Sequence, residues 1–160
     1  MKKILLVCML TLSMSMQAQE VFNELRQKNK AIVENQQNNE VIRQISQFKL
    51  DALNYLVIKM QEEMPDSSAY YLDVQAYSMN AYVTLYIKKL VDLSKMPEAL
   101  QEEMTRLFME TTRENPLFKD KDKDLVLSYY KRAECITRFS LDTDWEKALE
   151  IISKLMEDNK

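Results

Sequence analysis

Few residue types in this chain could carry chemistry, and the missing types restrict it most. The 160 residues include no His and no Gly. Without His there is no Ser-His or Cys-His nucleophile, no imidazole metal ligand and no His-based pH switch. Without Gly there is no phosphate-binding loop of the P-loop or dinucleotide type, because those loops need backbone conformations that Gly alone adopts easily. We therefore expect neither a metal site nor a cofactor.

Two short patterns resemble functional motifs but lack their companion residues. Asp120, Asp122 and Asp124 have the spacing of the first ligands of an EF-hand, but the Gly of that loop is missing. Residues 46–49 and 128–131 match the Ser-x-x-Lys pattern of penicillin-binding enzymes, whose Lys-Thr-Gly element cannot occur here. We interpret the three acids as a solvated helix start and neither Ser-x-x-Lys pattern as a catalytic site.

Cys135 is the only cysteine after residue 18. A leftover thiol outside the cytoplasm indicates intermolecular pairing or a reactive group. Because Ile136 is adjacent and no His can activate the thiol, we favour a small buried apolar residue. Adjacent acids such as Glu62 and Glu63 point apart on a helix, so they form no acid–base pair. A His-free, metal-independent enzyme that uses carboxylate and Tyr groups is the alternative to a binding protein.

A tyrosine-rich stretch supplies one group of candidate binding residues. Tyr77, Asn80 and Tyr82 lie close together in it. Aromatic rings would pack on a guest molecule, and an amide would orient it. The alternative is an ordinary core in which the Tyr hydroxyls reach the surface or one another, and we favour it because aromatic residues at helical spacing are usually core.

The stretch 133–145 supplies a second group, because it has no helical periodicity. It contains Arg138, Asp142 and Trp145. Loops carry function more often than core helices do, so this segment is a candidate partner-binding surface. The alternative is a structural tether in which Arg138 pairs with a nearby acid.

The stretch 67–93 must position the tyrosines, and we predict it to be one long helix. Its main apolar residues recur at alternating intervals of four and three, which places them on one helix face. They are Leu72, Ala76, Met79, Val83, Tyr86, Leu90 and Leu93. A second stripe includes Tyr70 and Tyr77, and no charged residue falls between Asp73 and Lys88. A helix that is apolar on several sides is usually buried inside a bundle, so we expect it to be central.

The remaining apolar stripes predict further helices, separated by polar or Pro-containing breaks. These helices cover 20–34, 40–63, 97–114, 121–132 and a last segment that starts at a Thr143–Glu146 capping box. The fold class is therefore an all-α bundle of five or six helices around the long helix at about 67–93. We divide the chain into a signal peptide (1–18), an N-terminal helix with a polar linker (19–39) and a bundle domain (40–158).

The first 18 residues have the pattern of a secretory signal peptide. Lys2 and Lys3 precede an apolar run over 4–12, and small residues end at Ala18, where we expect cleavage. The apolar run is too short to span a bilayer. The chain as a whole, including the Gln-Ala-Gln of 17–19, resembles small uncharacterised exported helical proteins of Bacteroidota-type bacteria. That resemblance implies a periplasmic or secreted helical protein and no particular activity.

Charge and composition restrict the partners. The net charge is −3, and removal of residues 1–18 leaves 20 of the 22 basic side chains against 25 acidic ones, a net charge of −5. An acidic chain gives no electrostatic reason to bind nucleic acid or an anionic membrane. We expect an exported, non-enzymatic binding or interaction module, monomeric or homodimeric, whose partner is a protein or a small apolar ligand.

Overall fold

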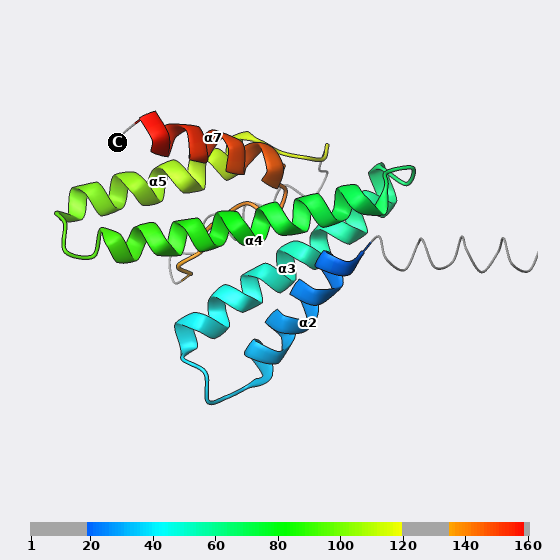
Figure 1. The fold of residues 1–160 in the computed structure, drawn as a ribbon, viewed down its shortest axis with the longest axis horizontal. Helices are drawn as coiled ribbons and strands as arrows, with labels where there is room; N and C mark the ends of the chain where they lie inside the picture. Colours follow the sequence, from blue (N-terminus) through cyan, green and yellow to red (C-terminus); the bar gives the residue numbers. More distant parts are fainter. Residues whose placement is uncertain (1–18, 120–134, 159–160) are drawn as a thin grey trace, which may run out of the picture.

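The computed structural model describes residues 19–119 and 135–158, and in these ranges the chain is all-helical (Figure 1). The helices are α2 (Glu20–Glu34), α3 (Glu40–Glu63), α4 (Ala69–Asp92), α5 (Glu98–Glu114) and α7 (Trp145–Asp158). The predicted all-α bundle is confirmed. The expected signal peptide, the expected helix over 121–132 and the Asp120–Asp124 pattern lie outside the described residues. None of the described helices combines the length and hydropathy that a membrane crossing requires.

The helix ends show how a chain without Gly terminates its helices. No described residue has a positive φ angle, so the left-handed C-cap that Gly usually supplies is not used. Side chains cap the N-termini of α3 and α4: Asn39 accepts a hydrogen bond from the N–H of Val41 (2.8 Å), and Ser68 accepts one from the N–H of Tyr71 (3.2 Å). A Pro follows the C-cap of both α3 and α5, where it prevents the helix from continuing.

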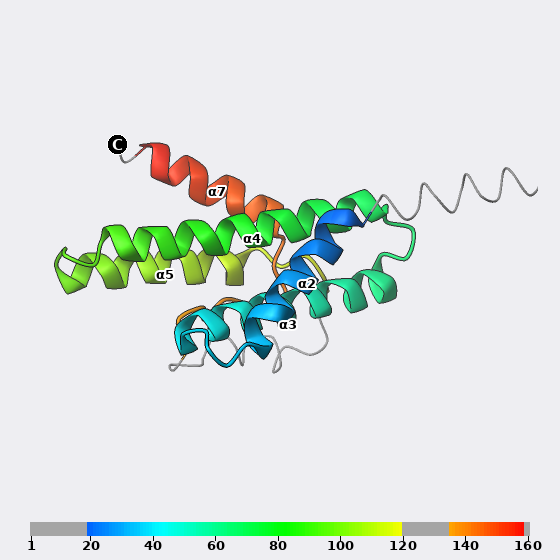
Figure 2. The same cartoon turned by 60° about the horizontal axis from the view of Figure 1, so that its bottom comes forward.

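Helix α4 packs against each of the other four described helices. Figure 1 shows it between α5 and α7 on one side and α2 and α3 on the other, and Figure 2 shows α7 and the α2–α3 pair on opposite sides of it. Most of its predicted main stripe is buried, namely Leu72, Ala76, Met79, Val83 and Tyr86. The second stripe is different, because Tyr70 and Tyr77 are 73% and 62% exposed. One side of α4 is therefore open to solvent, and α3 equals α4 in length at 24 residues, so the expectation of one central long helix is not confirmed.

The irregular segment before α7 runs through the interior and supplies the centre of an aromatic cluster. The ring of Phe139 meets Phe48, Tyr82 and Tyr86 at centroid separations of 5.7, 5.5 and 5.0 Å. Trp145 joins the cluster through Tyr82 at 5.7 Å. Most of these contacts are edge-on, which is the favourable arrangement for aromatic quadrupoles. Residues from α3, α4, α7 and this segment thus share one core.

Helix α7 begins one residue later than the predicted capping box would place it. The Thr143 hydroxyl donates to the carbonyl of Ser140 (2.8 Å), so it is used to hold the preceding segment. Asp144 is the N-cap, and its Oδ1 accepts from the N–H of Lys147 (3.2 Å). The prediction of Thr143 as the cap is wrong because a buried turn offered its hydroxyl another partner.

Candidate functional site

Two of the predicted binding residues, Tyr82 and Trp145, lie in the interior. Both are 0% exposed. The Tyr82 hydroxyl donates to the carbonyl of Phe108 (2.7 Å), and burial raises the pKa of Tyr82 far above its usual value. The backbone N–H of Trp145 donates to Oε1 of Gln75 (2.8 Å). These contacts give both residues a structural role in the aromatic core.

The predicted residues of the irregular segment are also turned inward or half-buried. The Asp142 carboxylate is buried and accepts from the backbone N–H groups of Leu117 (3.0 Å) and Phe118 (2.9 Å), just beyond the end of α5. Arg138 and Cys135 are half-buried. Asp142 thus tethers the segment in the way that the sequence suggested for Arg138.

Tyr77 and Asn80 lie on the same helix but in different surroundings. Tyr77 is exposed to solvent, whereas Asn80 is half-buried and lines a pocket between three helices. The structure therefore does not bring the predicted site residues together, and among the pockets whose linings are described, Asn80 is the predicted residue that lines one.

The Asn80 pocket is formed where α2, α3 and α4 meet, and its volume is about 270 Å³. One part of its wall is aliphatic and the other is polar. Isoleucines supply the aliphatic wall: Ile32, Ile42 and Ile45. The polar side chains are Lys28, Asn29, Ser46, Lys49, Asn80 and Thr84. We call this cavity the Lys49 pocket.

Lys49 is the chemically unusual residue of the pocket. Its Nζ donates a hydrogen bond to Oδ1 of Asn80 at 2.7 Å. Within the described ranges, no carboxylate lies within ion-pair distance of it. Burial, and then the nearby positive charge of Lys28, lower the pKa of Lys49 from 10.5 to about 8. A half-buried ammonium with an amide instead of an acid as its partner is a candidate binding group.

Lys59 on the same helix shows what an ordinary half-buried lysine looks like in this fold. Its side chain is 13% exposed, and it pairs with Glu62 (3.1 Å) and Glu63 (4.0 Å). The two carboxylates balance the charge of that lysine. Among the described residues, Lys49 has no carboxylate partner of this kind, so the difference between the two lysines lies in their described partners and not in the helix that carries them.

The sequence contained a weak signal for this pocket. Lys49 follows Ile42 by seven residues and Ile45 by four, so a charged residue stands on an apolar helix face. Ser46 and Lys49 are also the two ends of one Ser-x-x-Lys pattern, and both line the pocket. The hydrogen bond of Lys49 described here goes to Asn80, which does not give Ser46 the base that the enzyme motif requires.

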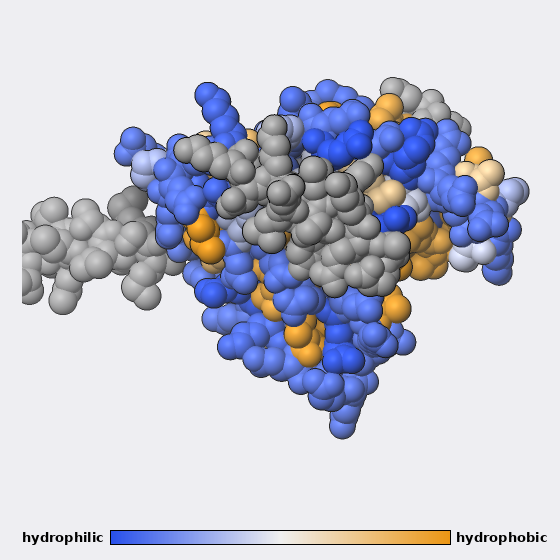
Figure 3. Space-filling model, turned by 180° about the vertical axis from the view of Figure 1, so that it is seen from behind, coloured by the Kyte–Doolittle hydropathy of each residue, from blue (hydrophilic) through white to orange (hydrophobic). Residues whose placement is uncertain are grey.

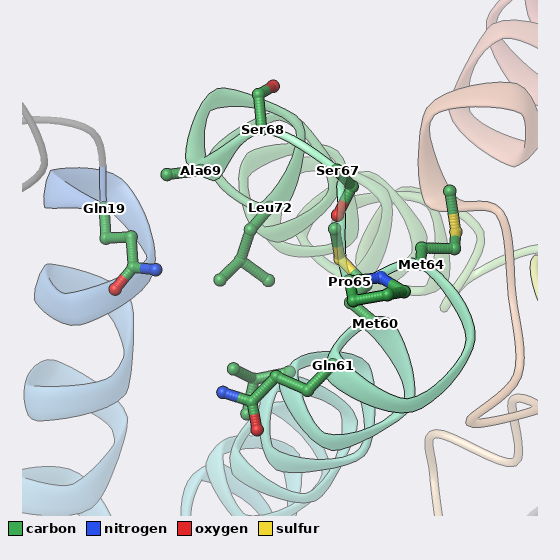
Figure 4. Close-up of a pocket in the computed structure, with 10 residues that line it drawn as sticks. Gln19, Met60, Gln61, Met64, Pro65, Ser67, Ser68, Ala69 and Leu72 are labelled. Carbon is green, nitrogen blue, oxygen red and sulfur yellow. The ribbon is translucent and has the colours of Figure 1, made fainter.

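Other hollows are less suited to hold a specific ligand. The groove between α2 and α3 is larger, at about 540 Å³, but it has no half-buried charged side chain comparable to Lys49, because Arg26, Lys30 and Glu34 are all exposed. A pocket of about 250 Å³ between the start of α2 and the α3–α4 turn has no charged lining residue; Gln19 and Gln61 extend toward it from opposite sides (Figure 4). We rank the Lys49 pocket first on its chemistry, although it is not the largest.

The described residues form no second candidate metal or acid–base site. No group of three or more Cys, Asp and Glu in the described ranges is arranged to hold a metal ion. The four pockets with described linings contain at most one carboxylate each, so none of them holds a pair of acids. On the face shown in Figure 3, hydrophobic residues form separate patches in a mainly hydrophilic surface.

Comparison with known proteins adds no family to this description. No family model, curated protein or solved structure gave a significant match to the chain.

Proposed function

We propose that this protein is an exported, non-enzymatic binding protein whose Lys49 pocket holds a small carboxylate with an aliphatic part. The observation that carries the proposal is Lys49 itself, a half-buried lysine whose described partner is the Asn80 amide. A ligand carboxylate would supply the negative charge that the pocket lacks.

The rest of the pocket fits the two halves of such a ligand. Lys28 adds a second positive charge, and Ser46 and Asn80 add groups that can donate hydrogen bonds to a carboxylate. Ile42 is 50% exposed at the edge of the pocket, where an aliphatic chain would cover it. The pocket is small, so we expect a short chain and not a long fatty acid.

The energetic cost of Lys49 supports a functional role. A lowered lysine pKa means that the charged form is less stable in the folded protein than in the unfolded chain. An apolar residue of similar length would avoid this cost. Residues that reduce stability in this way are found preferentially at functional sites, where a ligand compensates for them.

Export is the second half of the proposal and depends on the sequence. The basic start, the apolar run over 4–12 and the small residues that end at Ala18 support a signal peptide, with a mature chain that begins at Gln19 in the periplasm or outside the cell. Native mass spectrometry on the protein exported from its full-length gene tests both halves together. We expect a chain that starts at Gln19 and a retained or titratable small carboxylate; an uncleaved chain would overturn export.

Titration separates charge recognition from simple apolar binding. We expect pentanoate to bind, and pentanamide, which has the same chain and no charge, to bind at least tenfold more weakly. Equal affinity for the two compounds would contradict the proposed function, because the lysines would then contribute nothing to recognition.

A further inference from the structure

We propose that the Lys49 amine forms a reversible imine with small aldehydes that also carry a carboxylate, that is, with short oxo acids. This inference rests on the proposed function, because the carboxylate of the oxo acid would use the same pocket. It narrows the ligand from any small carboxylate to one with a reactive carbonyl group.

The geometry leaves the Lys49 nitrogen available for this reaction. Its described hydrogen bond runs to Oδ1 of Asn80, and a carbonyl oxygen can only accept. A neutral Lys49 amine can therefore donate one N–H to Asn80 and keep its lone pair directed elsewhere. Lys59 differs, because its described partners are the carboxylates of Glu62 and Glu63.

The surroundings of Lys49 also increase the neutral fraction of the amine. The described charged side chain at the pocket is Lys28, and it adds to the effect of burial. With a pKa of about 8, roughly one fifth of Lys49 is neutral at pH 7.4, compared with roughly one in a thousand for a lysine at 10.5. Desolvation of a lysine in this way is a known means of activating its amine.

The reaction is balanced without any further reagent. The Lys49 lone pair attacks the aldehyde carbon, and a C–N bond forms. Proton transfer then moves the two amine hydrogens to the former carbonyl oxygen, which leaves as water. The product is a C=N bond between Lys49 and the ligand. Lys28 lines the same pocket and offers a second basic side chain to the carboxylate of the ligand after Lys49 has reacted.

The inference is tested by reductive labelling of the full-length exported protein. Succinic semialdehyde and cyanoborohydride are added at pH 7.4, and the labelled lysines are mapped by peptide mass spectrometry. We expect Lys49 to be labelled at least tenfold faster than Lys59, to react more slowly with butanal, which lacks the carboxylate, and to be protected by succinate.

The possible failures separate this inference from the proposed function. Equal labelling of Lys49 and Lys59 overturns the imine, and the proposed function stands if pentanoate still binds. Rapid labelling by butanal and succinic semialdehyde alike overturns the oxo-acid class. An Asn80→Asp variant places a carboxylate beside Lys49, so it should reduce the labelling rate at least tenfold; an unchanged rate in that variant contradicts the role of the neutral amine.

Discussion

The Nζ atom of Lys49 on α3 lies 2.7 Å from Oδ1 of Asn80 on α4, and this contact joins the two helices at one wall of the pocket. An amide oxygen orients an ammonium but does not neutralise it. The hydrogen bond to Asn80 therefore fixes the position of the Lys49 ammonium and leaves it able to bind a negatively charged ligand. The predictions that follow test this pair and the core that supports it.

Replacement of Lys49 by Met should stabilise the protein at pH 7. Met has a similar length and no charge, so the variant avoids the desolvation of an ammonium. The lowered pKa of Lys49 indicates a gain of roughly 1–3 kcal/mol in the free energy of unfolding. Urea denaturation at pH 7 measures this gain. The matched control is Lys59→Met, which removes an ion-paired lysine and should not stabilise.

The pH dependence of stability gives an independent check on Lys49. The unfolded Lys49 titrates near 10.5 and the folded one near 8, so between these values the unfolded chain binds more protons. The free energy of unfolding should therefore rise with pH above 8, whereas below 8 the cost of Lys49 is fully present. Denaturation at pH 7 and pH 9.5 should show the gap between wild type and Lys49→Met narrowing. A constant gap would mean that the pKa of Lys49 is not lowered.

Replacement of Gln75 should reduce the free energy of unfolding more than replacement of an exposed polar residue. It is 0% exposed, donates to Oδ1 of Asp144 (3.0 Å) and accepts from the N–H of Trp145 (2.8 Å). Gln75→Leu leaves both groups without this partner at the start of α7, so we expect a loss of about 2–4 kcal/mol in chemical denaturation. Gln47→Leu, at an exposed position, is the control and should change stability by less than about 0.5 kcal/mol.

Phe139 should hold the irregular segment in place. Its ring is 0% exposed and contacts the aromatic rings of α3 and α4. Phe139→Ala removes these contacts and leaves a cavity, which costs about 3–5 kcal/mol. Thermal denaturation checks this, with Tyr70→Ala as the control because that ring is 73% exposed. Similar losses in both variants would contradict the described core.

The helices were predictable because their signals are local. The bounds of α2 and α3 coincide with the predicted 20–34 and 40–63, since apolar stripes of helical period end there at a polar linker and before Pro65. The start of α7 was misplaced because the Thr143 hydroxyl is used in the buried turn, where it donates to the carbonyl of Ser140 (2.8 Å) and, at 3.3 Å, to the carbonyl of Thr112 on α5. Propensity rules do not include such partners.

The pocket was predictable only in part, because it depends on how three helices cross. Asn80 was selected from the sequence for its place among tyrosines, but its important neighbours are Lys28 on α2 and Lys49 on α3. No sequence spacing relates these residues. Similarly, the apolar residues around Phe139 predict an irregular segment pinned to the core, but the sequence does not show that the aromatic rings that bury Phe139 come from distant helices.

The most direct test of the central claim is an isothermal titration of pentanoate into the wild-type protein and the Asn80→Asp variant at pH 7. Asp has the shape of Asn and places a carboxylate beside Lys49. That carboxylate would pair with the Lys49 ammonium, which the ligand carboxylate would otherwise contact. We predict measurable binding to the wild type and at least a tenfold loss in the variant, with the fold unchanged by circular dichroism. Equal binding to both proteins would contradict the Lys49 pocket as the site.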